Sequence, residues 1–358
     1  MDKAATDFLF RLLETPSPSG FETEIQQVVK KRASRFADEV EIDVHGNLIA
    51  VVNPSGKLRV MLAGHCDQIG MMVTHIDDKG YIYFGPIGGL DPTVIPGSRV
   101  SIHTRRGLVV GVIGNKPIHL LPESERGKRL ELRHLWIDIG AKNGDEAKAR
   151  VRIGDPITYQ LGASRLGKTA ITSPGCDDRV GTFVVMEALR LFSEKRQAKK
   201  SQVALFAVST VQEELGLRGA RTASYGIDPA AGIAVDVAHA SDNPGAEAKE
   251  IGTVKLGAGP TIARGANINP VLEKLLVDTA ERLKIAYQPL GMPLASGTDA
   301  NVMQVNRKGV AAALVGIPNR YMHTQVEVVD LRDLELAVRL VGETALAMTP
   351  NMNFVPRR

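Results

Sequence analysis

Hydrophobic positions near the N-terminus repeat with the period of an α-helix. The first apolar series consists of Phe8, Leu9, Leu12 and Leu13. It stops at the helix-breaking sequence Pro16-Ser17-Pro18-Ser19-Gly20. A second helix is predicted after this break, because Ser19 and Glu22 have the spacing of a capping box. Its helical period continues through Ile25, Val28, Val29, Arg32 and Phe36.

Short apolar runs separated by turn residues follow these helices and predict strands. Val40–Val44 and Leu48–Val52 flank a turn, and Val60–Ala63 has the composition of a buried strand that ends at Gly64-His65. From about Ile69 to Leu161 the pattern changes to short alternating segments between Gly- and Pro-containing turns. The strands predicted in that stretch are Met71–Ile76, Tyr81–Phe84, Arg99–Thr104, Leu108–Ile113 and Pro156–Gln160. We interpret the stretch as a small β module inserted into another domain.

Helices and strands alternate again from Asp177 onward. The predicted order is a helix to about Glu194, strand Val203–Ser209, a helix from Leu215, strand Gly232–Val235, a helix capped at Asn269-Pro270, strand Val310–Val315 and a last helix from Asp330. This alternation is typical of an α/β domain. The sequence therefore predicts an α/β core interrupted by the β module.

Composition excludes several classes of protein. The 358 residues are 44% hydrophobic and 23% charged, as in ordinary globular proteins. The longest apolar run, around Val203–Val208, is too short to cross a bilayer, and the N-terminus lacks the pattern of a secretory signal. Two cysteines are too few for a disulfide framework. With 4% aromatic residues, no basic face interleaved with stacking rings is found. We expect a cytoplasmic protein that binds neither membranes nor nucleic acid.

Acidic residues and histidines follow several of the predicted strands. They are His65 and Asp67, Glu213 and Glu214, Asp236, and His323, with Asp177 and Asp178 just before the helix that follows the β module. Open α/β sheets bind ligands at the carboxyl ends of their strands, so we expect one rim to gather these side chains. A mixture of imidazole and carboxylate ligands suits zinc, cobalt or manganese.

The adjacent residues Glu213 and Glu214 are predicted to have different roles. Adjacent side chains diverge, so one can bind a metal while the other holds water as a general base. His65 and Asp67 can have different roles in the same way. The imidazole of His65 can bind a metal, and a nearby carboxylate such as that of Asp67 can orient an imidazole that does so. The pattern favours a metal-dependent reaction with a separate carboxylate base.

These residues lie within longer motifs that span nearly the whole chain. The motifs are Gly64–Gly70, Asp177–Gly181, Val211–Ala220, Val235–Ala240, Gly297–Ala300 and Arg320–His323. In this order they resemble the tetrahedral, dodecameric metallo-aminopeptidases of metallopeptidase family forty-two, which include glutamyl and deblocking aminopeptidases.

The resemblance implies both a fold and an assembly. The fold would be a mixed-sheet, zinc-peptidase-like catalytic domain made of residues 1–67 and 164–358. An inserted β-rich, barrel- or PDZ-like dimerisation domain would occupy residues 68–163. Dimers would assemble into a dodecamer whose cavity admits unfolded peptides, the expected substrates.

The resemblance also implies roles for individual residues. Two divalent ions per subunit, zinc or cobalt with manganese as a further choice, would be held by His65, Asp177 and Asp236 and by Asp177, Glu214 and His323. Glu213 would be the general base. Asp67 would support catalysis from behind His65, and Arg179 would lie near the bridging Asp177.

Some positions depart from the family pattern. Residue 68 is Gln where relatives usually have Glu, and Cys66 and Cys176 replace residues that are usually aliphatic or methionine. Thr324-Gln325 stands where Ser-Pro is common. These changes remove none of the expected ligands.

Alternatives remain open at this level. The same two-metal site could hydrolyse N-acylated amino acids or other small amides, or metals could merely connect the subunits of an assembly protein. Acidic, aliphatic and basic N-terminal residues all remain open as the preferred substrate. His239 is expected to make a structural hydrogen bond, and Thr298 either to position substrate or to cap the helix that follows it.

Overall fold

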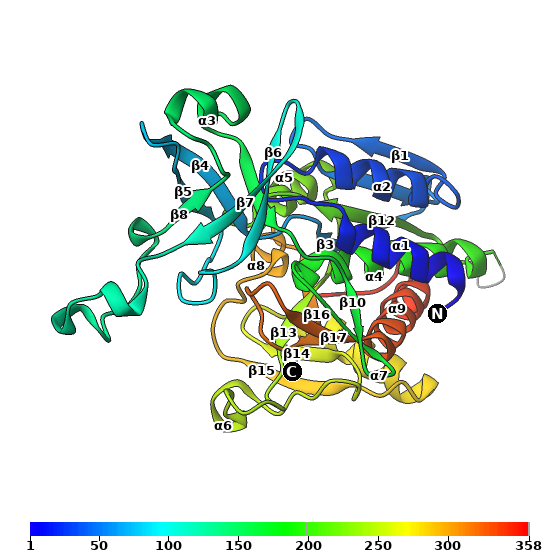
Figure 1. Cartoon of the computed structure of the whole chain (residues 1–358). Coiled ribbons are helices and arrows are strands. Elements are labelled where there is room, and N and C mark those ends of the chain that lie inside the picture. Colours follow the sequence, from blue (N-terminus) through cyan, green and yellow to red (C-terminus); the bar gives the residue numbers. More distant parts are fainter. Residues whose placement is uncertain (198–199, 357–358) are drawn as a thin grey trace.

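The structure is a computed structural model that describes residues 1–197 and 200–356. A mixed β-sheet forms the centre of its larger part, with strand order β1-β2-β12-β3-β13-β16-β14-β15 (Figure 1). The strands are β1 Glu39–Ile42, β2 Leu48–Val52, β3 Leu58–His65, β12 Val203–Thr210, β13 Ala231–His239, β14 Thr261–Gly265, β15 Gln288–Met292 and β16 Ala311–Asn319. Because β12, β3, β13 and β16 run parallel, their carboxyl ends lie at the same edge of the sheet.

Helices cover the central strands. The helices are α1 Lys3–Glu14, α2 Thr23–Ala33, α4 Cys176–Lys195, α5 Arg218–Ile227, α6 Ala248–Ile251, α7 Pro270–Leu283, α8 Asp299–Gln304 and α9 Leu331–Ala347. Helices α4 and α9 pack together and against the sheet, and α5 and α8 form a second such pair. Strands β12, β13 and β16 are consequently buried over nearly their whole length, as expected of strands covered on both faces.

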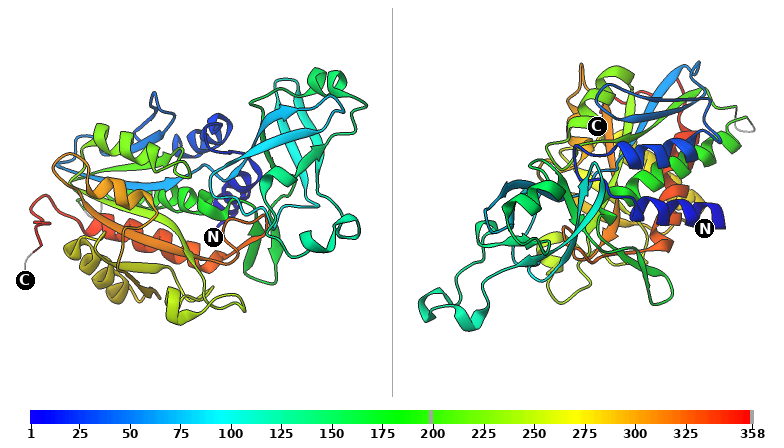
Figure 2. Two further views of the ribbon diagram at one scale, coloured as in Figure 1. Left: turned by 90° about the vertical axis from the view of Figure 1, so that its left-hand side faces the viewer. Right: turned by 45° about the horizontal axis from the view of Figure 1, so that its top comes forward.

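The inserted stretch forms a closed barrel of its own, set to one side of the sheet (Figure 2). In barrel order its strands are β4 Gly70–Ile76, β5 Ile82–Ile87, β8 Trp136–Asp138, β7 Gly107–Gly114, β6 Arg99–Thr104 and β9 Pro156–Tyr159, and α3 Gly144–Arg150 precedes β9. The barrel encloses a separate hydrophobic core that includes Met71, Ile82 and Ile137. An arm between β7 and β8 projects from it and contains the short 3₁₀ turns Ile118–Leu120, Glu123–Glu125 and Leu132–His134.

A small antiparallel sheet connects the end of the insertion to the region of α4. Its strands are β10 Ser164–Leu166, β11 Ala170–Ser173 and β17 Glu327–Asp330. Among the described residues, no helix combines the length and apolar character that a membrane crossing requires.

The predicted fold class, an α/β core with an inserted β barrel, is confirmed by these elements. The cap predicted at Asn269 is present, since its side chain accepts hydrogen bonds from backbone N–H groups of the first turn. The helix predicted from Asp330 is also found, and the Asp330 side chain caps it. The capping box predicted at Ser19 and Glu22 is wrong, because Glu22 makes no capping bond to α2. Strands β8, β14 and β15 escaped prediction because they are short or interrupted by Gly and Pro.

Candidate active site

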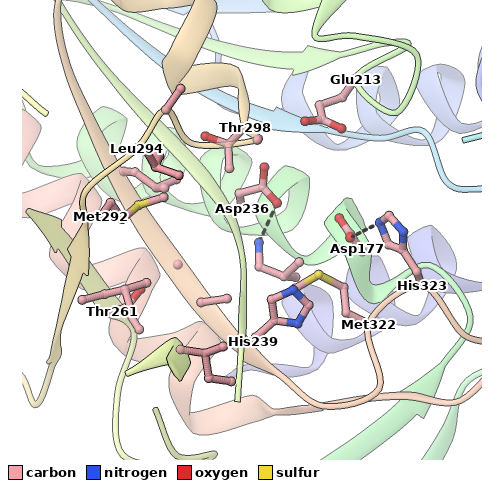
Figure 3. Close-up of a pocket in the computed structure, with 18 of the residues that line it drawn as sticks. Asp177, Glu213, Asp236, His239, Thr261, Met292, Leu294, Thr298, Met322 and His323 are labelled. Atoms are coloured by element: carbon pink, nitrogen blue, oxygen red, sulfur yellow. Dashed lines mark hydrogen bonds and ion pairs between the residues drawn. The ribbon is translucent and has the colours of Figure 1, made fainter. Parts of the chain in front are cut away.

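The metal-ligand candidates meet at the carboxyl edge of the parallel strands. His65 is the last residue of β3, Asp236 lies in β13, and Asp177 lies in the first turn of α4. Glu213 and Glu214 follow β12, and His323 follows β16. All six line one pocket of about 420 Å³, part of which Figure 3 shows. The expectation that one rim gathers these side chains is therefore met.

Asp177 lies between the two imidazoles. Its Oδ1 is 3.1 Å from Nε2 of His65, and its Oδ2 is 3.3 Å from Nε2 of His323. Each carboxylate oxygen thus faces a different histidine. This is the placement needed by a carboxylate shared between two ions.

Backbone carbonyl groups orient both imidazoles. Nδ1 of His65 is 3.0 Å from the carbonyl oxygen of Asp67, and Nδ1 of His323 is 3.0 Å from that of Gly89. Carbonyl oxygens only accept hydrogen bonds, so each Nδ1 carries a proton and Nε2 is the nitrogen available for a metal. Gly89 follows β5, so the inserted barrel contributes directly to the site.

Potential ligand atoms are close enough to share ions. Three groups have such atoms within 4.8 Å of one another: His65, Asp177 and Asp236; Asp177, Glu214 and His323; and His65, Glu213 and Glu214. The first two have the members that the family resemblance implies. Glu213 Oε2 lies 3.7 Å from Nε2 of His65, beside the first group.

The electrostatics of the cluster suit cations. Burial raises the pKa of Glu213 to about 10 and that of Glu214 to about 7. Burial also raises the pKa of Asp236, and the charge of Asp177 adds to this effect. A divalent cation would favour the ionised carboxylates and so reverse these shifts. The donor set, two imidazoles among crowded buried carboxylates, therefore fits metal binding.

Asp67 acts on the loop after β12 as well as on His65. Its carboxylate accepts hydrogen bonds from the backbone N–H groups of Glu213 (3.0 Å) and Glu214 (3.2 Å) and from the hydroxyl of Ser19 (2.6 Å). Its nearest approach to the imidazole of His65 is 3.5 Å. The carboxylate of Asp67 thus lies next to His65, but its hydrogen bonds go mainly to the loop that carries Glu213 and Glu214.

Two buried glutamates that sequence reasoning missed support the same site. Glu327 accepts hydrogen bonds from the backbone N–H of Asp177 (2.8 Å) and of His323 (3.1 Å). Glu22 accepts one from the backbone N–H of Gln212 (3.1 Å), next to Glu213. Sequence patterns assign Glu22 only to a capping box and do not single out Glu327, because the contacts with Gln212 and Asp177 that tie them to the site span 190 and 150 residues of the chain.

Asp178 and Arg179 have structural contacts. Asp178 accepts hydrogen bonds from the backbone N–H groups of His65 (3.1 Å) and Gly181 (3.0 Å). Arg179 is buried and donates to backbone carbonyls, including those of Leu12, Leu13 and Thr15, and to Oε1 of Gln68 (2.6 Å). Gln68 therefore supplies a neutral acceptor where relatives usually have a carboxylate.

One minor prediction is wrong, and one of the two roles considered for Thr298 is not observed. The side chain of His239 has no hydrogen-bond partner among residues 1–197 and 200–356; it is exposed and lines the pocket. Thr298 occupies the N-cap position of α8 but makes no capping bond, and its hydroxyl is 2.9 Å from that of Ser296. It does line the pocket, so the alternative role in positioning substrate stays a prediction.

A mixed α/β sheet that gathers imidazoles and carboxylates beside a pocket at its strand ends is the arrangement of a metal-dependent hydrolase. Comparisons with known proteins identify the family. The family model described as M42 glutamyl aminopeptidase matches residues 46–340, and the chain therefore belongs to the M42 peptidase family.

Individual relatives cover nearly the whole chain. The lysyl aminopeptidase of Pyrococcus furiosus is 38% identical over 353 residues, which are 98% of this chain and 99% of that protein. The TET aminopeptidase from the marine sediment archaeon Thaumarchaeota archaeon SCGC AB-539-E09 has a TM-score of 0.91 and 34% identity, with 96% of each chain covered. The TET1 peptidase of Pyrococcus horikoshii, which can assemble into a tetrahedron or a large octahedral shell, has a TM-score of 0.85 and 29% identity, covering 96% of this chain and 100% of that one.

Membership in this family makes the chain a hydrolase of the exopeptidase type, an aminopeptidase. A protein whose metals only connect subunits is thereby excluded.

Proposed function

We propose that the chain hydrolyses the N-terminal bond of peptides with two divalent ions and with Glu213 as the general base. The observation that carries this proposal is the placement of Asp177, whose two oxygens face different imidazoles at 3.1 and 3.3 Å. His65, Asp177 and Asp236 would hold one ion, and Asp177, Glu214 and His323 the other. Zinc, cobalt and manganese all accept such mixed ligands.

When bound, the ions would polarise the scissile carbonyl group and lower the pKa of water. Glu213 lies beside His65 and borders the pocket. Its carboxylate would take the proton from the attacking water and pass it to the leaving amine. Asp67 would assist by holding the backbone of Glu213 and Glu214.

The substitution Glu213→Gln tests this assignment. It keeps the shape of the side chain but removes the base, so we expect kcat to fall by about 10²- to 10⁴-fold. Metal content, measured by mass spectrometry after reloading with zinc, cobalt or manganese, should remain that of the wild-type protein. Glu247→Gln changes an exposed glutamate and is the matched control.

Two results would contradict the proposal. A Glu213→Gln enzyme with near-normal turnover would remove the base from the mechanism. Rapid hydrolysis of N-acetylated amino acids, with no cleavage of peptides that have a free N-terminus, would favour the amidase alternative.

We also propose that residues 68–163 form a dimerisation domain, with residues 1–67 and 164–358 as the catalytic domain, and that dimers assemble into a cytoplasmic dodecamer. Strand β7 supports the interface, because Leu108, Val110 and Val112 point outward and are 64%, 48% and 46% exposed. Apolar stripes of this kind mark protein contacts.

The assemblies named for the P. horikoshii relative support the proposed oligomer. The free thiols of Cys66 and Cys176 suit a reducing compartment and so support the cytoplasmic location.

A further inference from the structure

The pocket extends beyond the proposed metal ligands to a wall of apolar side chains (Figure 3). Leu290 and Met292 come from β15, and Leu294 comes from the segment that follows it. Ile251 of α6 and Met322, next to His323, complete the wall. The wall thus lies beside the place where the scissile bond would be held.

Much of this apolar surface is uncovered in the free chain. The side chain of Leu294 is 77% exposed, and Met292 and Met322 are only partly buried. Exposed apolar surface inside a pocket favours ligands that cover it with apolar groups of their own. The wall therefore offers contacts to a large hydrophobic side chain.

The pocket lacks the charges that would recognise a charged side chain. Among its described lining residues there is no lysine or arginine, and each carboxylate belongs to the cluster assigned to metal binding or catalysis. His239 is the one titratable lining residue outside that cluster, and it is exposed. A lysine or glutamate side chain placed against this wall would lose water without gaining a partner of opposite charge.

We propose that this pocket binds the side chain of the substrate's N-terminal residue and selects large uncharged residues, leucine and methionine above all. The proposal rests on the function proposed for the adjacent cluster. It narrows the choice among acidic, aliphatic and basic residues, which the sequence left open, to the aliphatic class.

A panel of chromogenic aminoacyl substrates tests the preference in the metal-loaded, full-length protein. The kcat/KM values for leucyl and methionyl substrates should exceed those for alanyl, lysyl and glutamyl substrates by about 10- to 200-fold, the range that hydrophobic pockets achieve. A lysyl or glutamyl substrate that matched or exceeded the leucyl one would overturn the inference while leaving the peptidase assignment intact. Failure to hydrolyse every substrate in the panel would instead reject the proposed function.

Substitutions in the apolar wall test whether this surface determines the preference for the substrate's N-terminal side chain. Met292→Ala should lower the leucyl-to-alanyl ratio of kcat/KM by about tenfold, because methylene contacts are lost. Met352→Ala, the same change close to the C-terminus and outside the pocket, should leave the ratio unchanged.

Leu294→Asp provides a gain-of-function test at an exposed position that folding does not require to be apolar. The new carboxylate should raise the lysyl-to-leucyl ratio of kcat/KM by at least about tenfold, since it supplies the missing partner charge. Leu166→Asp, at another exposed leucine outside the pocket, is the matched control. Unchanged ratios in both Met292→Ala and Leu294→Asp would show that this wall does not bind the N-terminal side chain.

Discussion

Glu327 holds the backbone of two proposed metal ligands, Asp177 and His323. Its carboxylate oxygens accept the backbone N–H groups of Asp177 and His323, so one buried side chain fixes both residues that would hold the same ion. Burial raises the pKa of Glu327 to about 8, and the charge of Asp177 contributes to this rise. Glu327 is thus sensitive to the charge of the cluster, although it does not line the pocket.

We predict that Glu327→Gln weakens metal binding. The amide keeps one acceptor oxygen but offers its NH₂ group where the second N–H now donates, so one ligand backbone loses its anchor. Loss of such support typically costs about 10- to 100-fold in metal affinity. Competition with a chelating dye measures this affinity. Glu343→Gln, at a buried glutamate of α9 that pairs with Lys195, is the control. Unchanged affinity in Glu327→Gln would show that the contact is only structural.

At the scale of elements, the loop after β12 is held in place by side chains from other parts of the chain. Three successive backbone N–H groups, those of residues 212 to 214, donate to the carboxylates of Glu22 and Asp67. The loop needs this support because Gln212 has a φ of 54°, in the left-handed region that residues with a side chain rarely occupy. The start of α2 therefore helps to hold the proposed base.

Glu22→Leu should accordingly lower kcat by about tenfold or more, because misplacing a base by a fraction of an ångström is costly. KM should change little, since Glu22 does not line the proposed substrate pocket. Glu22→Gln keeps the acceptor oxygen and should restore most of the rate. Glu24→Leu replaces an exposed glutamate on the same helix and is the control. If the Leu and Gln variants lost kcat equally, the anchoring hydrogen bond would not explain the effect.

At the scale of the whole molecule, the barrel has two different surfaces. One side reaches the cluster of proposed metal ligands through Gly89, whose carbonyl oxygen orients His323. Strand β7 presents the apolar stripe of Leu108, Val110 and Val112 to solvent. Assembly through this stripe would thus involve the same domain that completes the metal site.

Val110→Glu should therefore yield a smaller particle than the wild-type assembly. The side chain points away from the barrel core, so the charge should disturb an interface more than the fold. Light scattering after size-exclusion chromatography measures the mass, which we expect to be that of a dodecamer for the wild type. Leu166→Glu, on β10 outside the barrel, should keep the wild-type mass. Persistence of the full assembly in Val110→Glu would place the contact elsewhere.

The sequence by itself determined the class of fold and the members of the cluster. Helical and strand periods are local properties, which is why the α/β core and the inserted β-rich stretch could be read from them. The meeting of the polar residues that follow the strands could also be predicted, because parallel strands end at one edge of the sheet.

Only the tertiary structure decided how the cluster is supported and what surrounds it. Glu22 bonds to the backbone of Gln212, 190 residues away along the chain, and Glu327 to that of Asp177, 150 residues away. The apolar wall combines α6, β15 and the loop that carries His323. Contacts between segments so distant leave no periodic trace in the sequence, because they depend on how the elements pack rather than on which elements form.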